Sequence, residues 1–152
     1  MGKFLVTVLG MTALMLSGCA VADELSLPAT KDAKITCWPE EADWNGGKAA
    51  KLRAKGIQKN SAEIILVDFD RAALKTFLDK NAGKDVAAKL VLTVAAVAEG
   101  PAALEAAALD CGSDWTEGAK DSQKADKGEC SFLSAQTDAK KWSGADAKEV
   151  AN

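Results

Sequence analysis

The N-terminal segment limits both where this chain folds and how much of it is left to fold. Lys3 is followed by an apolar run, residues 4–16, that is shorter than a membrane-spanning helix requires and fits the hydrophobic region of a secretory signal peptide. We therefore predict that residues 1–18 are a signal peptide and that the exported chain folds without them. Removing 18 of the 152 residues leaves 134. A chain of that length forms one domain that buries roughly two-thirds of its unfolded surface.

The end of the apolar run carries a lipid-attachment pattern. Leu16-Ser17-Gly18-Cys19 matches a bacterial lipobox, which implies a diacylated Cys19 thiol, cleavage before Cys19 and a fatty acid such as palmitate on the new amino group. Several acyl chains anchor a protein durably, because each buried CH₂ contributes about 0.8 kcal/mol. Ala20, in place of an aspartate, predicts sorting to the outer membrane of a bacterial cell envelope. The alternative is an ordinary signal peptide with a chance cysteine.

Charge and composition exclude several classes of function. The formal net charge is −3 and the chain has no basic cluster, which argues against nucleic acid as a partner. Membrane association would then depend on the lipid anchor. The chain has no histidine, so Ser-His-Asp and Cys-His catalysis are unavailable, and so is the commonest zinc and copper ligand. We expect no enzyme activity.

The three remaining cysteines, Cys37, Cys111 and Cys130, would lie in an oxidising compartment after export. One disulfide and one free thiol is the simplest outcome. We favour the pair Cys111–Cys130, which closes the polar loop between them and would contribute on the order of 3 kcal/mol through chain entropy. Pairing of Cys37 with either of the others is the alternative.

Periodicity predicts a mostly β chain from residue 34 to residue 152. Residues 19–33 are polar and aperiodic and are predicted to be a linker from the lipid to the domain. Pro39 would end a first strand, and Gly56 a later one. The expected strands are residues 35–38, 50–55, 64–69, 86–97 and 129–133.

The other segments are predicted from turn and cap chemistry. Asp70 can cap a short helix that ends before Gly83, with Leu74, Phe77 and Leu78 on one face. Residues 118–128 read as a solvated loop, and Trp142 lies in a polar tail. Residues 101–110 favour a helix by alanine content, while their length and flanking turns also allow a strand.

Several short motifs occur in one order along the chain. They are Gly47-Lys48-Ala49-Ala50-Lys51-Leu52-Arg53, then Ile65-Leu66-Val67-Asp68-Phe69-Asp70 with Leu74, then Ala88-Lys89-Leu90-Val91-Leu92-Thr93-Val94, then Asp114-Trp115-Thr116-Glu117-Gly118, and finally 128–132 with Trp142. This order resembles the disaggregatase-related, DNRLRE-type domain family of secreted bacterial and archaeal proteins, including its W-x-E-G signature. The resemblance covers roughly residues 35–144.

The resemblance implies an all-β fold, an antiparallel β-sandwich of jelly-roll type with one short helix, and a strand at residues 101–110. Domains of this family are associated with carbohydrate-binding-like modules in cell-surface and polysaccharide-acting proteins. They continue with further strands beyond the position of Trp142, whereas this sequence stops at Asn152. We therefore expect an open sheet edge, which favours strand addition by a partner.

The candidate ligand residues are Trp44, Asp114, Trp115 and Glu117. An aromatic ring can stack on a sugar while carboxylates bind its hydroxyls or a structural calcium ion. The alternative, which we favour, is that Trp115 plugs the core and Glu117 accepts bonds from loop amides. Asp114 and Glu117 as the acid pair of a glycosidase is a minor alternative.

The sequence thus predicts a lipid-anchored, non-catalytic surface protein with a carbohydrate-binding-like sandwich and no cofactor other than a structural calcium. Its expected partners are the membrane, through the anchor, and glycans or another envelope protein. The alternative function is an assembly lipoprotein that binds a partner protein through an open sheet edge. A polysaccharide-acting enzyme is the third candidate.

Overall fold

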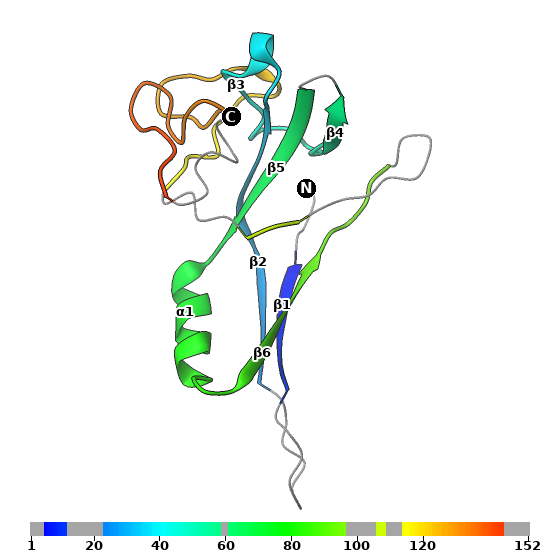
Figure 1. Cartoon of the computed structure of the whole chain (residues 1–152), viewed down its shortest axis with the longest axis vertical. Helices are drawn as coiled ribbons and strands as arrows, with labels where there is room; N and C mark the ends of the chain where they lie inside the picture. The colour runs from blue at the N-terminus through cyan, green and yellow to red at the C-terminus, as the bar shows by residue number, and fades with distance from the viewer. Residues whose placement is uncertain (1–4, 12–22, 59–60, 97–105, 109–113, 145–152) are drawn as a thin grey trace, which may run out of the picture. The chain divides into compact units, whose positions relative to one another are not determined.

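The computed structural model describes residues 5–11, 23–58, 61–96, 106–108 and 114–144 (Figure 1). The chain divides into two compact units. Unit 1 consists of Met1–Thr30 and Asp68–Val94, and unit 2 of Lys31–Val67 and Ala95–Asn152.

The described residues are mostly strands, with one α-helix. The elements are β1 (Leu5–Met11), β2 (Glu24–Thr36), the 3₁₀ turn η1 (Pro39–Glu41), β3 (Trp44–Asn45), β4 (Lys55–Gln58), β5 (Ser61–Phe69), α1 (Arg71–Lys80), β6 (Asp85–Val91) and β7 (Gln123–Lys124). β1 pairs antiparallel with β2 and with β6, β3 with β7, and β4 with β5. The predicted all-β class with one short helix is confirmed.

Unit 1 contains a sheet in which β1 lies between β2 and β6. The β1–β2 pairing runs from Leu5↔Pro28 to Leu9↔Glu24, and the pairing with β6 continues to Met11↔Asp85. The apolar run that the sequence assigns to the signal peptide is therefore the middle strand of this sheet in the uncleaved chain.

The helix of unit 1 begins and ends as its sequence predicts. The Asp70 carboxylate accepts a hydrogen bond from the Ala73 amide at 2.9 Å and so caps the N-terminus of α1. The chain turns after Asn81 through Gly83, which has a φ of +80°. Phe77 is buried, whereas Leu78 on the same predicted face is 43% exposed.

Unit 2 contains two small sheets and the larger core. Its first sheet has β5 between β4 and the C-terminal part of β2, and its second pairs β3 with β7. The Arg53 guanidinium and the Lys34 ammonium both contact the buried Glu63 carboxylate on β5. The core consists of Ala33, Ile35, Ala42, Leu66, Trp115, Cys130, Phe132, Ala135 and Trp142.

The predicted linker at residues 19–33 is wrong in its second half, since β2 begins at Glu24. Leu27, Ala33 and Ile35 have the same parity along β2, and all three are buried. Lys31 and Pro28 hide this alternation in the sequence, because a charged residue occupies one inward position and proline is rare in strands. A strand was therefore missed.

Other predicted strands shift or shorten. Residues 50–54 are irregular and the strand begins at Lys55, while the strand expected at 86–97 ends at Val91. In place of a strand at 129–133 there is an isolated bridge between Ser131 and Ser134. Of residues 101–110, only 106–108 are described, and they have no regular structure.

Trp142 is also not part of a solvated tail. It is 7% exposed, and its indole Nε1 donates to the Ser131 carbonyl oxygen at 3.0 Å. The polar residues around it in the sequence concealed this, because a single large aromatic can bury itself without any periodic pattern. Trp142 instead belongs to the core of unit 2.

Candidate functional site

Trp115, the centre of the predicted signature, is a packing residue. Its side chain is 5% exposed and belongs to the core of unit 2. The Lys31 ammonium lies 4.8 Å from the ring centroid and donates to the Trp115 carbonyl oxygen at 3.0 Å. This geometry combines a cation–π contact with a charge-assisted hydrogen bond. A ring this deeply buried offers no open face to a sugar.

The neighbouring carboxylates have different surroundings. Asp114 is exposed, and its carbonyl oxygen accepts from Gln136 Nε2 at 3.1 Å. Glu117 is half-buried, and its Oε1 accepts from the backbone amide of Asp32 at 3.4 Å. Glu117 thus ties its loop to β2 through a strand amide, whereas the sequence favoured loop amides as its partners.

Trp44, the fourth predicted ligand residue, is half-buried on β3 and pairs with Lys124 on β7. Trp115 and Glu117 contact β2 instead. All four residues therefore belong to unit 2, but Trp115 and Glu117 contact β2, whereas Trp44 pairs with a residue of β7. Nothing in these contacts assembles them into a single sugar-binding surface.

Asn45 is a residue whose importance the sequence did not reveal. It is 1% exposed, and its Nδ2 donates to the carbonyl oxygens of Glu117 at 2.7 Å and Cys130 at 2.9 Å. Its Oδ1 accepts from the amides of Gly47 at 3.0 Å and Lys120 at 3.3 Å. One buried side chain thus holds four backbone groups from three segments. By itself, the sequence Asn45-Gly46-Gly47 indicates only a turn.

Glycine is required around Asn45. Gly118 has a φ of +86°, and a Cβ there would collide with the Asn45 amide group. A Cβ at Gly47 would collide with the Glu117 carbonyl. Both glycines permit an approach of backbone to Asn45 that any side chain would block.

The two described cysteines of unit 2 are Cys130, which is buried, and Cys37, which is half-buried. The Cys130 Sγ accepts from Asn45 Nδ2 at 3.3 Å. Burial raises the pKa of the Cys130 thiol to about 12. The Cys37 Sγ accepts from the Ala62 amide at 3.0 Å. Cys19 and Cys111 lie outside the described residues, so the Cys111–Cys130 disulfide stays a prediction.

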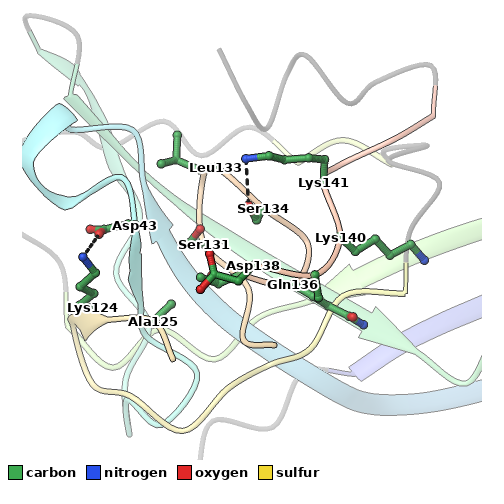
Figure 2. Close-up of a pocket in the computed structure, with 12 residues that line it drawn as sticks. Asp43, Lys124, Ala125, Ser131, Leu133, Ser134, Gln136, Asp138, Lys140 and Lys141 are labelled. Carbon is green, nitrogen blue, oxygen red and sulfur yellow. Dashed lines mark hydrogen bonds and ion pairs between the residues drawn. The ribbon is translucent and has the colours of Figure 1, made fainter. Parts of the chain in front are cut away.

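Unit 2 contains a groove (Figure 2). Its volume is about 470 Å³. Nine of its twelve lining residues are polar or charged, and the lining comprises Asp43, Lys124, Ala125, Ser131, Leu133, Ser134, Gln136, Thr137, Asp138, Ala139, Lys140 and Lys141. Most of these residues come from one short segment, 131–141, which has no regular secondary structure.

Backbone hydrogen bonds fix this segment. Ser131 and Ser134 pair through their backbones, with the Ser131 amide donating to the Ser134 carbonyl at 2.9 Å. Gln136 and Lys140 exchange two backbone bonds, at 2.9 and 2.8 Å. The turn between them includes Asp138, which adopts a φ of +58°. Because Trp142 also donates to the Ser131 carbonyl, the groove floor is attached directly to the core.

The groove side chains are hydroxyls, amides and charges. The Lys124 ammonium pairs with the Asp43 carboxylate at 3.1 Å, and the Lys141 ammonium donates to the Ser134 hydroxyl at 3.4 Å (Figure 2). Thr137 Oγ1 is buried and has no hydrogen-bond partner among the described residues. Such a set can hold a polar ligand through hydrogen bonds.

Within the described ranges there is no group of three or more histidine, cysteine, aspartate or glutamate side chains that could hold a metal ion. Among the same residues, no helix has the length and apolar character that crossing a membrane requires.

Comparison with known proteins adds no family assignment. No family model, no curated protein and no solved structure matches this chain.

Proposed function

We propose that this chain is a lipid-anchored, non-catalytic protein of a bacterial cell envelope, and that unit 2 binds a saccharide in the groove around Ser134. Two features support the proposal. The lipobox Leu16-Ser17-Gly18-Cys19 supports the anchor, and Ala20 after it supports sorting to the outer membrane. The polar groove of about 470 Å³ supports the binding function, and it is the observation that carries it.

The chemistry of the groove suits a ligand rich in hydroxyl groups. The Ser134 hydroxyl, the Gln136 amide and the Asp138 carboxylate all line it. These groups donate and accept hydrogen bonds in the combinations that sugar hydroxyls require. Ser131 and Ser134 belong to a segment tied to the core, so little side-chain ordering would oppose binding.

The absence of catalysis is part of this proposal. The chain has no histidine, and the raised pKa of Cys130 keeps its thiol protonated near neutral pH. Asp114 is exposed, whereas Glu117 bonds to a β2 amide. If the enzyme alternative were right, Glu117→Gln would abolish polysaccharide cleavage; unchanged cleavage by that variant would exclude Glu117 as its acid.

The DNRLRE-type resemblance and the jelly-roll arrangement also belong to the proposal. Antiparallel pairing of short strands is compatible with such a sandwich. Trp115 and Trp142, the two tryptophans of the resemblance, share one core. The proposal also includes a structural calcium ion near Asp114 and Glu117.

A glycan array, followed by calorimetry on the mature chain from residue 19, tests the binding function. We expect binding of envelope or extracellular polysaccharide fragments, with a several-fold loss in Ser134→Ala. Ser26→Ala, which removes an exposed hydroxyl from unit 1, is the matched control. No binding up to the millimolar range would contradict the proposal.

The anchor has its own test. In a bacterial host, a fatty-acid analogue should label the chain at Cys19 and leave Cys19→Ser unlabelled. The unlabelled variant should also leave the membrane fraction. Equal membrane association of both chains would refute anchoring through Cys19.

An assembly lipoprotein is the second candidate, and β1 favours it. β1 pairs with both β2 and β6 within unit 1, and it lies inside the predicted signal peptide. Cleavage before Cys19 would remove this strand and leave two unpaired strand edges, to which a strand of an envelope protein can add. This candidate predicts a stoichiometric partner on purification from the envelope. A stable, soluble and partner-free monomer would count against it.

A further inference from the structure

We infer that the groove takes an acidic saccharide and that Lys141, together with the Ser134 hydroxyl, binds its carboxylate. The inference rests on the proposed saccharide-binding function and adds the class of ligand and the residue that selects it.

The lining of the groove argues against a neutral sugar. None of its twelve residues is aromatic, and Leu133 is the largest apolar side chain among them. A neutral sugar would therefore gain no stacking contact. It would exchange hydrogen bonds with water for hydrogen bonds with serine and glutamine, at a small net gain for each bond. Hydrogen bonds to an ionised group are roughly twice as strong.

The charges of the groove point to an anion. Three lysines and two aspartates line it, which leaves one positive charge in excess on a chain whose net charge is −3. Lys124 is already paired with Asp43 at 3.1 Å. Lys140 and Lys141 are therefore the lysines whose charge is available to a ligand, with Asp138 as the one acidic group beside them.

The directions of the side chains distinguish these two lysines. In Figure 2 the Lys141 side chain extends over Ser134, whereas the Lys140 side chain extends away from Ser134. The Lys141 ammonium uses one donor for its 3.4 Å bond to Ser134 Oγ, and an ammonium group has three. A carboxylate beside this pair can accept from both the ammonium and the hydroxyl.

The backbone keeps this pair in place. Ser134 is 6% exposed and is bonded to Ser131, whose carbonyl accepts from the buried Trp142 indole. Lys141 directly precedes Trp142 in the chain, so both members of the pair are fixed next to the same core side chain. Such pre-organisation lowers the entropy that binding must overcome.

Two matched pairs of probes test the inference on the mature chain by calorimetry. The first pair is an oligogalacturonide and its methyl ester, and the second is sialyllactose and lactose. At low ionic strength we expect the acid of at least one pair to bind about tenfold more tightly than its neutral counterpart. This preference should shrink as salt is added.

Variants assign the preference to a residue. Lys141→Gln should bring the affinity for the acid down to that of its neutral counterpart. Lys127→Gln removes the same charge from an exposed residue outside the groove and should retain the preference. Circular dichroism should show that both variants are folded.

The possible failures are distinguishable. Equal affinity for acid and neutral probes would overturn the acidic ligand while supporting saccharide binding. An acid preference that survives in Lys141→Gln, or that falls equally in Lys127→Gln, would overturn the role of Lys141. Binding of none of the four probes would overturn the inference and weigh against the proposed function as well.

Discussion

The two units are stabilised in different ways. Of the twelve buried hydrophobic residues among the described ones, ten lie in unit 2, and unit 1 has only Leu27 and Phe77. Unit 1 has the longer regular pairing, between β1 and β6, and the α-helix. On β6, however, Val86 is 36% and Leu90 is 40% exposed. Among the residues whose burial is described, unit 1 is thus rich in secondary structure and poor in buried apolar side chains.

Unit 2 shows the opposite combination. The segment 114–144 has almost no regular secondary structure, and yet it contributes Trp115, Cys130, Phe132, Ala135 and Trp142 to the core. Its polar backbone groups are bonded to a few buried side chains, Asn45 foremost. Since burial of apolar area is the main favourable term in folding, we expect the stability of the chain to reside mostly in unit 2.

The largest expected effect comes from removing a core tryptophan of unit 2. Trp115→Ala should lower the free energy of unfolding by about 3–5 kcal/mol, since it leaves a large cavity and removes the cation–π contact with Lys31. Phe77→Ala, in unit 1, should cost less, because Leu27 is the one other buried hydrophobic side chain among the described residues of that unit. Urea denaturation of the chain that retains residues 1–18, the form in which the two units are compared, measures both. A greater loss for Phe77→Ala would reverse the comparison between the units.

The second prediction compares two buried asparagines. Asn45→Ala leaves the carbonyls of Glu117 and Cys130 and the Gly47 amide without their partner. We expect a loss of about 3 kcal/mol, since each unsatisfied buried group costs about 1–3 kcal/mol and some will find water.

Asn81 in unit 1 is the matched control. It is 3% exposed, but its side chain bonds only to the Phe77 carbonyl and the Lys84 ammonium within the same turn. Asn81→Ala should cost about 1 kcal/mol. Similar losses in the two variants would show that Asn45 does not unite the segments of unit 2.

The sequence predicts regular elements well where local signals are strong. The apolar run at 64–69 coincides with β5, and the Asp70 cap with the start of α1. Both depend on residues that are neighbours in the chain. By contrast, β2 was mistaken for a linker because Lys31 occupies an inward position, where its ammonium lies over Trp115. That partner is far away in the sequence, and no periodicity reveals it.

The candidate site was harder to predict for the same reason. The sequence selected residues by chemical type, and so it chose Trp115, which is buried, and Trp44, which belongs to another set of contacts. The groove at 131–141 is lined mainly by serines, lysines and a glutamine. These residue types are common in any sequence and do not by themselves indicate a site. These residues come together because of the turn at Asp138 and the hydrogen bond from Trp142 to Ser131. Neither feature corresponds to a recognisable sequence pattern.

The third prediction concerns the thiol in the core of unit 2. Burial raises the pKa of Cys130 from an ordinary value of 9.0 to about 12, so between these values the folded state retains a proton that the unfolded state loses. The stabilisation is complete below about pH 9 and is lost as the pH rises to about 12. The free energy of unfolding of the reduced chain should fall over this window.

Variants separate this slope from the titration of lysines. The difference in unfolding free energy between the reduced chain and Cys130→Ala should shrink as the pH rises from 9 towards 12. Cys37→Ala should leave the slope in place. A constant difference would show that Cys130 does not titrate in this window; a slope that appears only after reduction would support the predicted Cys111–Cys130 disulfide.

The smallest effect on stability should come from Thr137, whose hydroxyl oxygen is buried without a hydrogen-bond partner among the described residues. Thr137 Oγ1, in unit 2, has no hydrogen-bond partner among the described residues, so Thr137→Val removes a polar atom whose desolvation is uncompensated and should raise stability by up to about 1 kcal/mol. Thr76 in unit 1 is a useful contrast, since its hydroxyl donates to the Ala72 carbonyl at 2.9 Å. Thr76→Val should therefore be neutral or slightly destabilising. Because Thr137 lines the groove, a destabilised Thr137→Val would indicate instead that an ordered water there satisfies the hydroxyl and that the groove is hydrated to its floor.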